Sequence, residues 1–157
     1  MREAIVKPTT GTSLPLPAGR LTQDVEHDVR CAIRTHTPVL VSGGTSNERE
    51  LLARWIHAER HDSERAFQVV RCGERAVSLE AWLTTEAPGG TCYLDGVDEL
   101  DLETQTLVSR FIQHRGPHQV IAATGRDLFA LVGRDFSATL FYRLNVIHLV
   151  ISRGRAW

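Results

Sequence analysis

Residues 38–57 of this chain read Pro-Val-Leu-Val-Ser-Gly-Gly-Thr-Ser-Asn-Glu-Arg-Glu-Leu-Leu-Ala-Arg-Trp-Ile-His. A short apolar run ends at Gly43 and Gly44 and leads into an amphipathic segment, which is the strand, loop and helix order of a phosphate-binding loop. Such a loop reads G-x-x-x-x-G-K. Counting from Gly43 places Glu48 at the second glycine and Arg49 at the lysine. The layout of the loop is therefore present, while two residues that would serve the phosphates are replaced.

Length and composition favour one ordinary globular domain. The 157 residues are 42% hydrophobic and carry a formal net charge of -1, so no basic excess indicates nucleic acid. No apolar run approaches the roughly 20 residues that span a bilayer, and the first residues lack the order of a signal peptide. We expect a cytoplasmic protein that contacts no membrane and does not bind DNA directly.

The three cysteines, Cys31, Cys72 and Cys92, lack C-x-x-C spacing and predict neither a disulfide framework nor a zinc site.

Short apolar runs alternate with helical patterns along the chain. Strands are expected at residues 39–41, 67–70, 91–94, 119–123 and 146–151. Helices are expected at residues 22–37, 47–60, 78–85, 101–115, 127–132 and 138–144. This order predicts a three-layer αβα sandwich with a five-stranded, mainly parallel sheet. Such folds bind ligands at the carboxyl ends of their strands, where residues 42–45, Asp95 and Thr124 are expected.

Apolar spacing predicts the buried face of the main helices. For the helix at 47–60 these positions are Leu51, Leu52, Trp55 and Ile56, and for the helix at 101–115 they are Leu102, Leu107, Phe111 and Ile112. The expected domain covers residues 21–152, between an extended lead-in at 1–20 and a tail at 153–157.

Several stretches together resemble the AAA+ ATPase domain of sigma-54-dependent transcriptional activators, the sigma-54 interaction domain. Residues 42–57 follow the family loop T-G-E-S-G-T-G-K-E-L-V-A-R-A-I-H in step, and residues 90–100 follow its Walker B segment G-T-L-F-L-D-E-I-x-E-L. Residues 121–128 match the sensor stretch I-A-A-T-N-R-D-L, and residues 136–146 match F-R-x-D-L-Y-Y-R-L-N-V. The resemblance implies the P-loop NTPase core of an AAA+ module, here without the helical lid that follows it in the family.

The resemblance also indicates which positions would bind and hydrolyse the nucleotide. At most of these positions this chain carries a different residue from the family. Asp95 keeps the Walker B aspartate that helps to hold magnesium, but Gly96 replaces the glutamate that polarises water. Thr124 is kept and Gly125 replaces the sensor asparagine. The vestigial Walker A positions are Gly43, Gly44, Thr45, Ser46, Asn47, Glu48, Arg49 and Glu50.

Two family arginines act across a subunit boundary on the neighbouring nucleotide. Ser137 replaces the first, and Arg143 keeps the second. Loss of such a cation typically slows phosphoryl transfer by about a thousandfold or more. We therefore expect no catalytic residues, and the replaced positions argue against an enzyme.

Glu48 places a carboxylate where phosphates would lie. Two like charges about 4 Å apart repel by roughly 4 kcal/mol near a protein surface, and a helix N-terminus favours any anion. We hypothesise that Glu48 occupies the amide cradle of its own loop. No cofactor is then expected, although ATP or ADP with magnesium stays open as the alternative, in a nucleotide sensor or slow ATPase.

The family's G-A-F-T-G-A loop, which touches the sigma factor, has no counterpart between residues 72 and 90. The expected partner is therefore a protein, either an intact AAA+ activator or a second copy of this chain. His57 and His61 lie four apart, and Asp98, Glu99, Asp101 and Glu103 form an acidic run, but neither pattern carries a complete metal motif. No metal site is expected, and Asp101 is interpreted as a helix cap.

Overall fold

The computed structural model describes residues 23–60, 62–74, 89–114 and 118–151. The expected lead-in at 1–20, the helix at 78–85 and the tail at 153–157 lie outside the described residues. His61 also falls outside them.

A single five-stranded sheet forms the centre of the molecule. Its strands are β1 (Val39–Gly43), β2 (Phe67–Arg71), β3 (Gly90–Asp95), β4 (His118–Thr124) and β5 (Ile147–Ile151). They lie in the order β2-β3-β4-β1-β5, and every pairing within the sheet is parallel. The predicted five-stranded sheet is confirmed, with strand ends within one or two residues of those expected.

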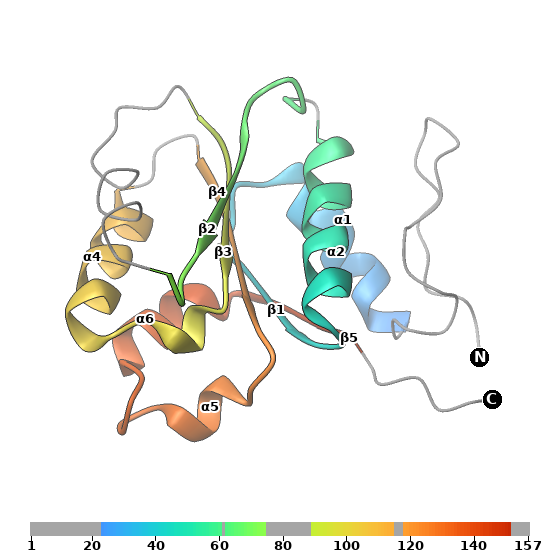
Figure 1. Cartoon of the computed structure of the whole chain (residues 1–157). Coiled ribbons are helices and arrows are strands. Elements are labelled where there is room, and N and C mark those ends of the chain that lie inside the picture. Colours follow the sequence, from blue (N-terminus) through green and yellow to red (C-terminus); the bar gives the residue numbers. More distant parts are fainter. Residues whose placement is uncertain (1–22, 61, 75–88, 115–117, 152–157) are drawn as a thin grey trace.

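Helices cover both faces of the sheet, as Figure 1 shows. Helices α1 (Gln23–Arg34) and α2 (Ser46–Ala58) lie on one face, and α4 (Leu102–Gln113) and α6 (Ala138–Leu144) lie on the other. A 3₁₀ turn, η1 (Val97–Glu99), follows β3, and a short helix, α5 (Leu128–Leu131), follows β4. The predicted αβα sandwich is confirmed.

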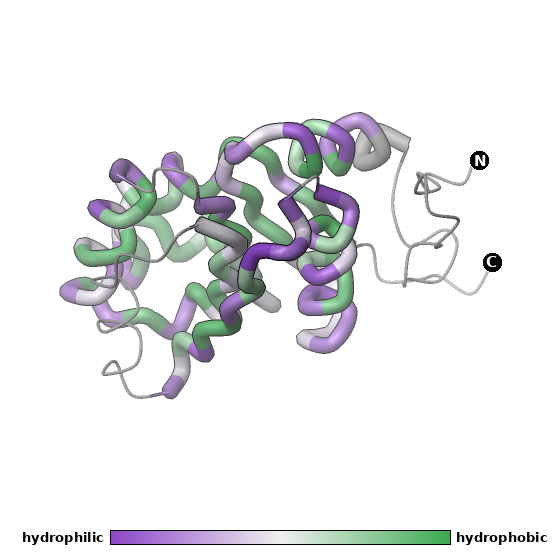
Figure 2. The backbone as a smooth tube through the Cα atoms, turned by 90° about the horizontal axis from the view of Figure 1, so that it is seen from above, coloured by the Kyte–Doolittle hydropathy of each residue, from purple (hydrophilic) through white to green (hydrophobic). Residues whose placement is uncertain are grey.

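Alternation along the strands creates two hydrophobic cores. Val39 and Val41 face α1 and α2, whereas Leu40 between them faces α4 and α6. Strand β4 is buried along its whole length, which explains why its central residues, Val120 to Ala123, are apolar without alternation. Figure 2 shows the hydrophobic strands in the middle and the hydrophilic positions of the helices around them.

The expected buried face of α4 is wrong in part. Leu102 is 58% exposed, and the buried positions are Thr104, Gln105, Val108, Ser109 and Ile112. Gln105 can be buried because its amide donates to the carbonyls of Leu100 and Asp135 and accepts from the amide of Ser137. An apolar pattern cannot reveal a face whose polar groups are satisfied by distant loops.

The buried face of α2 also differs from the expectation at several positions. Leu51 is only partly buried, whereas Arg49 and His57 are buried on the side of the helix that meets the sheet. Both side chains find polar partners there, so helical spacing of apolar residues alone did not identify them.

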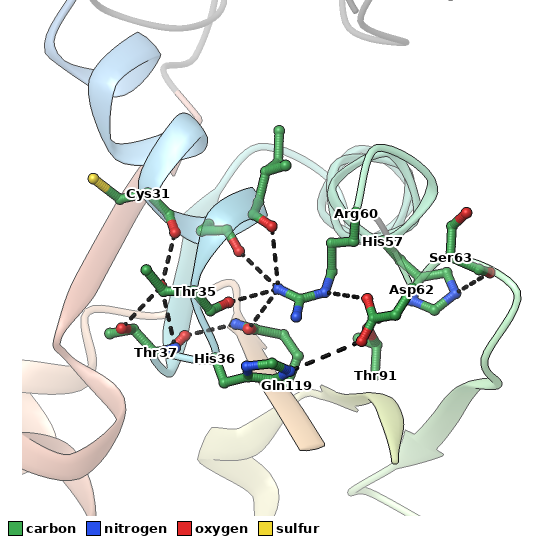
Figure 3. A network of polar contacts seen from close by, with 12 residues as sticks. Cys31, Thr35, His36, Thr37, His57, Arg60, Asp62, Ser63, Thr91 and Gln119 are labelled. Carbon is green, nitrogen blue, oxygen red and sulfur yellow. Dashed lines mark hydrogen bonds and ion pairs between the residues drawn. The ribbon is translucent and has the colours of Figure 1, made fainter. Parts of the chain in front are cut away.

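A polar network surrounds Arg60 at the amino edge of the sheet, the edge at which its strands begin (Figure 3). The guanidinium Nη1 donates to the carbonyls of Ala32 and Thr35 at 3.1 and 2.6 Å and to Oε1 of Gln119 at 3.1 Å. Nε donates to Asp62 at 3.1 Å. Arg60 is only 3% exposed, so this cation ties α1, α2 and β4 together inside the protein.

His57 belongs to the same edge. Its Nδ1 lies 2.7 Å from Oγ1 of Thr91, and its Nε2 lies 3.1 Å from the carbonyl oxygen of Ser63. Both ring nitrogens are therefore engaged in fixing the end of α2 on the first residues of β3.

Among the described residues, no helix has both the length and the apolar character that crossing a membrane requires.

Candidate functional site

The loop after β1 depends on two glycines with left-handed backbone. Gly43 has φ 79° and Gly44 has φ 60°. A Cβ at Gly43 would lie 2.3 Å from the carbonyl oxygen of Ile151, so this position also needs the absence of a side chain. The chain turns here from β1 into α2 at the carboxyl edge of the sheet, where strands β1, β3 and β4 end.

Glu48 closes a capping box at the start of α2. Its Oε1 accepts from the backbone N–H of Thr45 at 3.0 Å, and the Thr45 hydroxyl accepts from the N–H of Glu48 at 3.1 Å. The carboxylate thus takes one backbone amide of the loop itself. The exclusion of phosphate by Glu48 stays a prediction.

Arg49 folds back onto the loop. Its Nη1 donates to the carbonyl oxygens of Gly43 and Gly44, both at 2.8 Å. The residue is 9% exposed, and its Nη2 faces Gly125, where an added Cβ would lie 3.3 Å away. Nε has no hydrogen-bond partner among the described residues. The cation at the lysine position therefore binds the loop's own oxygens on one side and leaves a donor without a protein partner.

A second arginine, Arg71, connects Glu50 of the loop with the Walker B residue Asp95. Nη1 of Arg71, the last residue of β2, donates to Oε1 of Glu50 and to Oδ2 of Asp95, both at 2.8 Å. Burial acts to raise the pKa of Glu50, but hydrogen bonds from Arg71 and Arg54 outweigh it and lower this pKa. Hydrogen bonds to Asp95 and Glu50 raise the pKa of Arg71, which keeps the guanidinium charged.

Gly96 and Thr124 complete the edge. Gly96, with φ 74°, caps η1, and its N–H donates to the carbonyl of Ala123. The hydroxyl of buried Thr124 donates to Oδ1 of Asp98 at 2.7 Å and accepts from the N–H of Arg126 at 3.1 Å. No carboxylate side chain exists at position 96, and apart from the chain neighbours of Gly96, Oε2 of Glu99 would lie 3.3 Å from a Cβ added there.

Arg143 lies away from this edge. Its Nη1 donates to the carbonyl and to the hydroxyl of Ser109 on α4, at 2.7 and 2.9 Å. Ser137 caps α6 through its hydroxyl, which accepts from the N–H of Leu140. Arg143 is therefore bound to α4 of the same chain, and its role as an arginine finger stays a prediction.

A pocket of about 620 Å³ opens between the loop and the carboxyl edge. It is lined by Ser46, Arg49, Arg71, Gly73, Glu74, Asp95, Gly96, Asp98, Glu99, Gly125 and Arg126. Three arginines and four carboxylates face it, so the charges at the wall nearly balance with a small acidic excess. Asp98 and Glu99 belong to this wall, whereas Asp101 caps α4 as predicted, accepting from the N–H of Thr104 at 2.7 Å.

Sequence reasoning missed Arg71 and Arg126 as residues of the site. A signal existed for Arg71, because it follows the expected strand at 67–70 as Asp95 follows the strand at 91–94. In the sheet Arg71 and Asp95 are register partners. Carboxyl ends of adjacent parallel strands meet, so strand ends read together would have joined this pair. A signal also existed for Arg126, because it lies in the sensor stretch just after the expected strand at 119–123.

A metal site would need several His, Cys, Asp or Glu side chains close together. In the described part of the chain, no three His, Cys, Asp or Glu side chains gather where they could hold an ion.

The fold and the site together define a P-loop NTPase core of the AAA+ class. The NtrX protein of Brucella abortus in complex with ADP superposes with a TM-score of 0.69 at 24% identity, covering 82% of this chain and 34% of that one. The P-loop NTPase domain of a sigma-54 activator from Escherichia coli gives a TM-score of 0.66 at 17% identity, covering 82% of this chain and 92% of that one. At these identities the likeness concerns the fold.

Sequence comparison narrows the class to a family. The family model of the sigma-54 interaction domain matches residues 16–153, and the chain belongs to this family. The regulatory protein AtoC of Escherichia coli K12 is 32% identical over 160 residues, covering 82% of this chain and 35% of AtoC. The response regulator PilR of Pseudomonas aeruginosa is 32% identical over 148 residues, covering 74% and 33%. The chain thus spans about a third of the length of these regulators.

Proposed function

We propose that this chain is a degenerate sigma-54 interaction domain that does not hydrolyse ATP and acts as a regulatory or protein-interaction module in bacterial transcription control. The observation that carries the proposal is the position of Arg49. Its Nη1 donates to the carbonyls of Gly43 and Gly44, so this nitrogen is already bound within the loop and is not offered to a ligand in the pocket that Arg49 lines. A side chain used in this way supports the loop but offers the outer phosphates less than a lysine would.

The surroundings of Arg49 support the same proposal. Glu48 takes the amide of Thr45, and Gly96 supplies no group that could polarise water. The acidic excess of the pocket wall adds repulsion toward a triphosphate. The domain would then act by binding another protein through its surface. We propose that this partner is an intact AAA+ activator or a second copy of this chain, in the cytoplasm.

Isothermal titration with ATP and magnesium tests the proposal. The parent protein is expected to show no binding in the micromolar range, because its loop groups are already bound to each other. The double variant Glu48→Gly/Arg49→Lys restores the loop pattern and is expected to gain binding by at least about tenfold, or roughly 1.4 kcal/mol. Arg54→Lys makes the same change of side chain on the same helix outside the loop and serves as the control.

Micromolar affinity of the parent would overturn the proposed closure of the loop. If the double variant folds, as circular dichroism would show, and still gains nothing, the loop is not what limits binding. Either result replaces the present explanation with a defined alternative.

The second candidate function is nucleotide binding without turnover, as in a sensor. The pocket of about 620 Å³ beside the loop favours it, since this volume is large enough for a nucleotide. ATP or ADP binding by the parent, together with an absence of phosphate release above the buffer rate, would support this candidate over the first.

A further inference from the structure

One side-chain nitrogen joins two carboxylates at the mouth of the pocket. Nη1 of Arg71 lies 2.8 Å from Oε1 of Glu50 and 2.8 Å from Oδ2 of Asp95. The three residues come from β2, α2 and β3, so the contact holds together three elements that are separate in the chain. A charged nitrogen shared between two carboxylates makes strong hydrogen bonds to both.

Both carboxylates stand at positions that bind magnesium in nucleotide-binding motifs, Glu50 in the phosphate-binding loop and Asp95 in the Walker B segment. In G-x-x-x-x-G-K-[ST] the last residue binds the ion, and counting from Gly43 places Glu50 there. Asp95 is the Walker B aspartate. Magnesium requires oxygen ligands at about 2.0–2.1 Å in octahedral geometry. With the arginine nitrogen already bound to both oxygens, the residues present do not fit the ion.

The guanidinium of Arg71 keeps its charge and its place between the two carboxyl groups. Hydrogen bonds to Asp95 and Glu50 raise the pKa of Arg71, and the same contact with Arg71 helps to lower the pKa of Glu50 despite its burial. The guanidinium of Arg71 therefore stays charged between the carboxyl groups of Glu50 and Asp95.

We propose that Arg71 is a built-in replacement for the divalent cation of this site, which makes the pocket independent of metal and restricts it to ligands that arrive without a bound divalent ion. Arg71 supplies the positive charge that Glu50 and Asp95 need, at the cost of the space in which a metal would be coordinated. It acts as a specificity-determining residue, because removing it exposes two carboxylates that face one position.

The inference concerns the pocket of the proposed function, but the two can fail separately. ATP binding by the parent in the presence of a chelator would contradict the closed loop and leave the role of Arg71 intact. Metal binding by the parent would contradict the role of Arg71 and leave the closed loop intact.

Binding of Mn²⁺, followed by electron paramagnetic resonance without nucleotide, tests the proposal. Arg71→Gln is expected to bind Mn²⁺ at least about tenfold more tightly than the parent. Arg54→Gln is the matched control. Arg54 donates to the other oxygen of Glu50 at 3.1 Å, so the control removes an equal charge next to Glu50 and keeps the bridge to Asp95. The control is expected to behave like the parent.

A further variant locates the ion. Arg71→Gln/Asp95→Asn is expected to lose the Mn²⁺ affinity that Arg71→Gln gains, because one of the two carboxylates is gone. The Arg71 side chain is 43% exposed, so the substitutions leave the cores intact, and circular dichroism confirms the folded state. Equal Mn²⁺ binding by the parent and Arg71→Gln would overturn the proposal, as would an equal gain in Arg54→Gln.

Thermal unfolding provides a second readout that needs no paramagnetic ion. Magnesium chloride is expected to raise the melting temperature of Arg71→Gln relative to sodium chloride of the same ionic strength, since an ion that binds only the folded state stabilises it. The parent is expected to show no such difference. A magnesium effect of equal size in both proteins would contradict the built-in cation.

Discussion

The two edges of the sheet both carry buried arginines, but their guanidinium groups bind different parts of the protein. At the amino edge, Arg60 is 3% exposed and donates to carbonyls of α1 and the segment after it, to Gln119 and to Asp62. At the carboxyl edge, Arg49 is 9% exposed, donates to two carbonyls of its own loop and lines a pocket of about 620 Å³.

The difference separates structural from functional use of the same residue type. Arg60 donates to buried groups of α1, of β4 and of the loop after α2, so it adds polar bonds to a packing that these elements also make through a shared hydrophobic core. Arg49 binds carbonyls that water could reach if the arginine left, because Gly43 and Gly44 are only partly buried and Arg49 itself lines the pocket. The amino edge is therefore expected to govern stability, and the carboxyl edge is expected to govern which ligands enter.

The largest effect is expected at the amino edge. Arg60→Ala leaves buried carbonyls, the amide of Gln119 and the carboxylate of Asp62 without their partner, and is expected to lower the free energy of unfolding by about 3–5 kcal/mol. Urea denaturation measures it. Arg54→Ala, on the helix that Arg60 follows but with a half-exposed side chain, is the control and is expected to cost about 1 kcal/mol or less. A loss below about 1 kcal/mol in Arg60→Ala would remove the basis of the comparison.

Alanine substitutions at two glycines test why the loop requires glycine at position 43. Gly43 and Gly133 both have left-handed φ, 79° and 84°, but an added Cβ meets the Ile151 carbonyl at Gly43 and nothing within 4 Å at Gly133. Gly133→Ala is expected to cost about 1 kcal/mol, and Gly43→Ala about 2–4 kcal/mol, because it must also displace β5. Chemical denaturation of the two variants gives the difference, and equal losses would show that conformation alone demands glycine at the loop.

Arg49 is expected to matter less for stability than Arg60. Arg49→Ala is expected to lower the free energy of unfolding by about 1–2 kcal/mol, since the freed carbonyls of Gly43 and Gly44 can bind water from the pocket. Denaturation under the conditions used for Arg60→Ala measures it. A loss as large as that of Arg60→Ala would mean that both edges serve stability equally.

The smallest effect is a dependence on acid. The pKa of Glu50 is lowered in the folded state, so its contribution is complete above the unfolded pKa of about 4.3 and is lost as the pH falls through the lower folded value. Stability of the parent between neutral and acidic pH is expected to fall slightly more steeply than that of Glu50→Gln. Thermal unfolding at a series of pH values compares the two slopes, and identical slopes would show that Arg71 and Arg54 contribute nothing through Glu50.

Patterns along the chain were sufficient for the architecture and for the positions of the loop. Short apolar runs separated by helical spacing depend on local burial, and this is why the five parallel strands and the place of Gly43, Asp95 and Thr124 at one edge followed from the sequence. The Walker A, Walker B and sensor positions could also be identified from the sequence, because the residues of each motif lie close together in the chain and keep a fixed spacing.

The tertiary structure alone decided where the long polar side chains go. The bonds of Arg49 to its own loop, the bridge of Arg71 between Glu50 and Asp95, and the burial of Gln105 in α4 join elements far apart in the chain. Arginine and glutamine carry several donors on flexible stems, so their partners depend on which groups the fold leaves unsatisfied nearby. The sequence determined that Glu48 and Arg49 replace the glycine and lysine of the loop, and the fold decided that a carboxylate and a guanidinium there bind the loop itself.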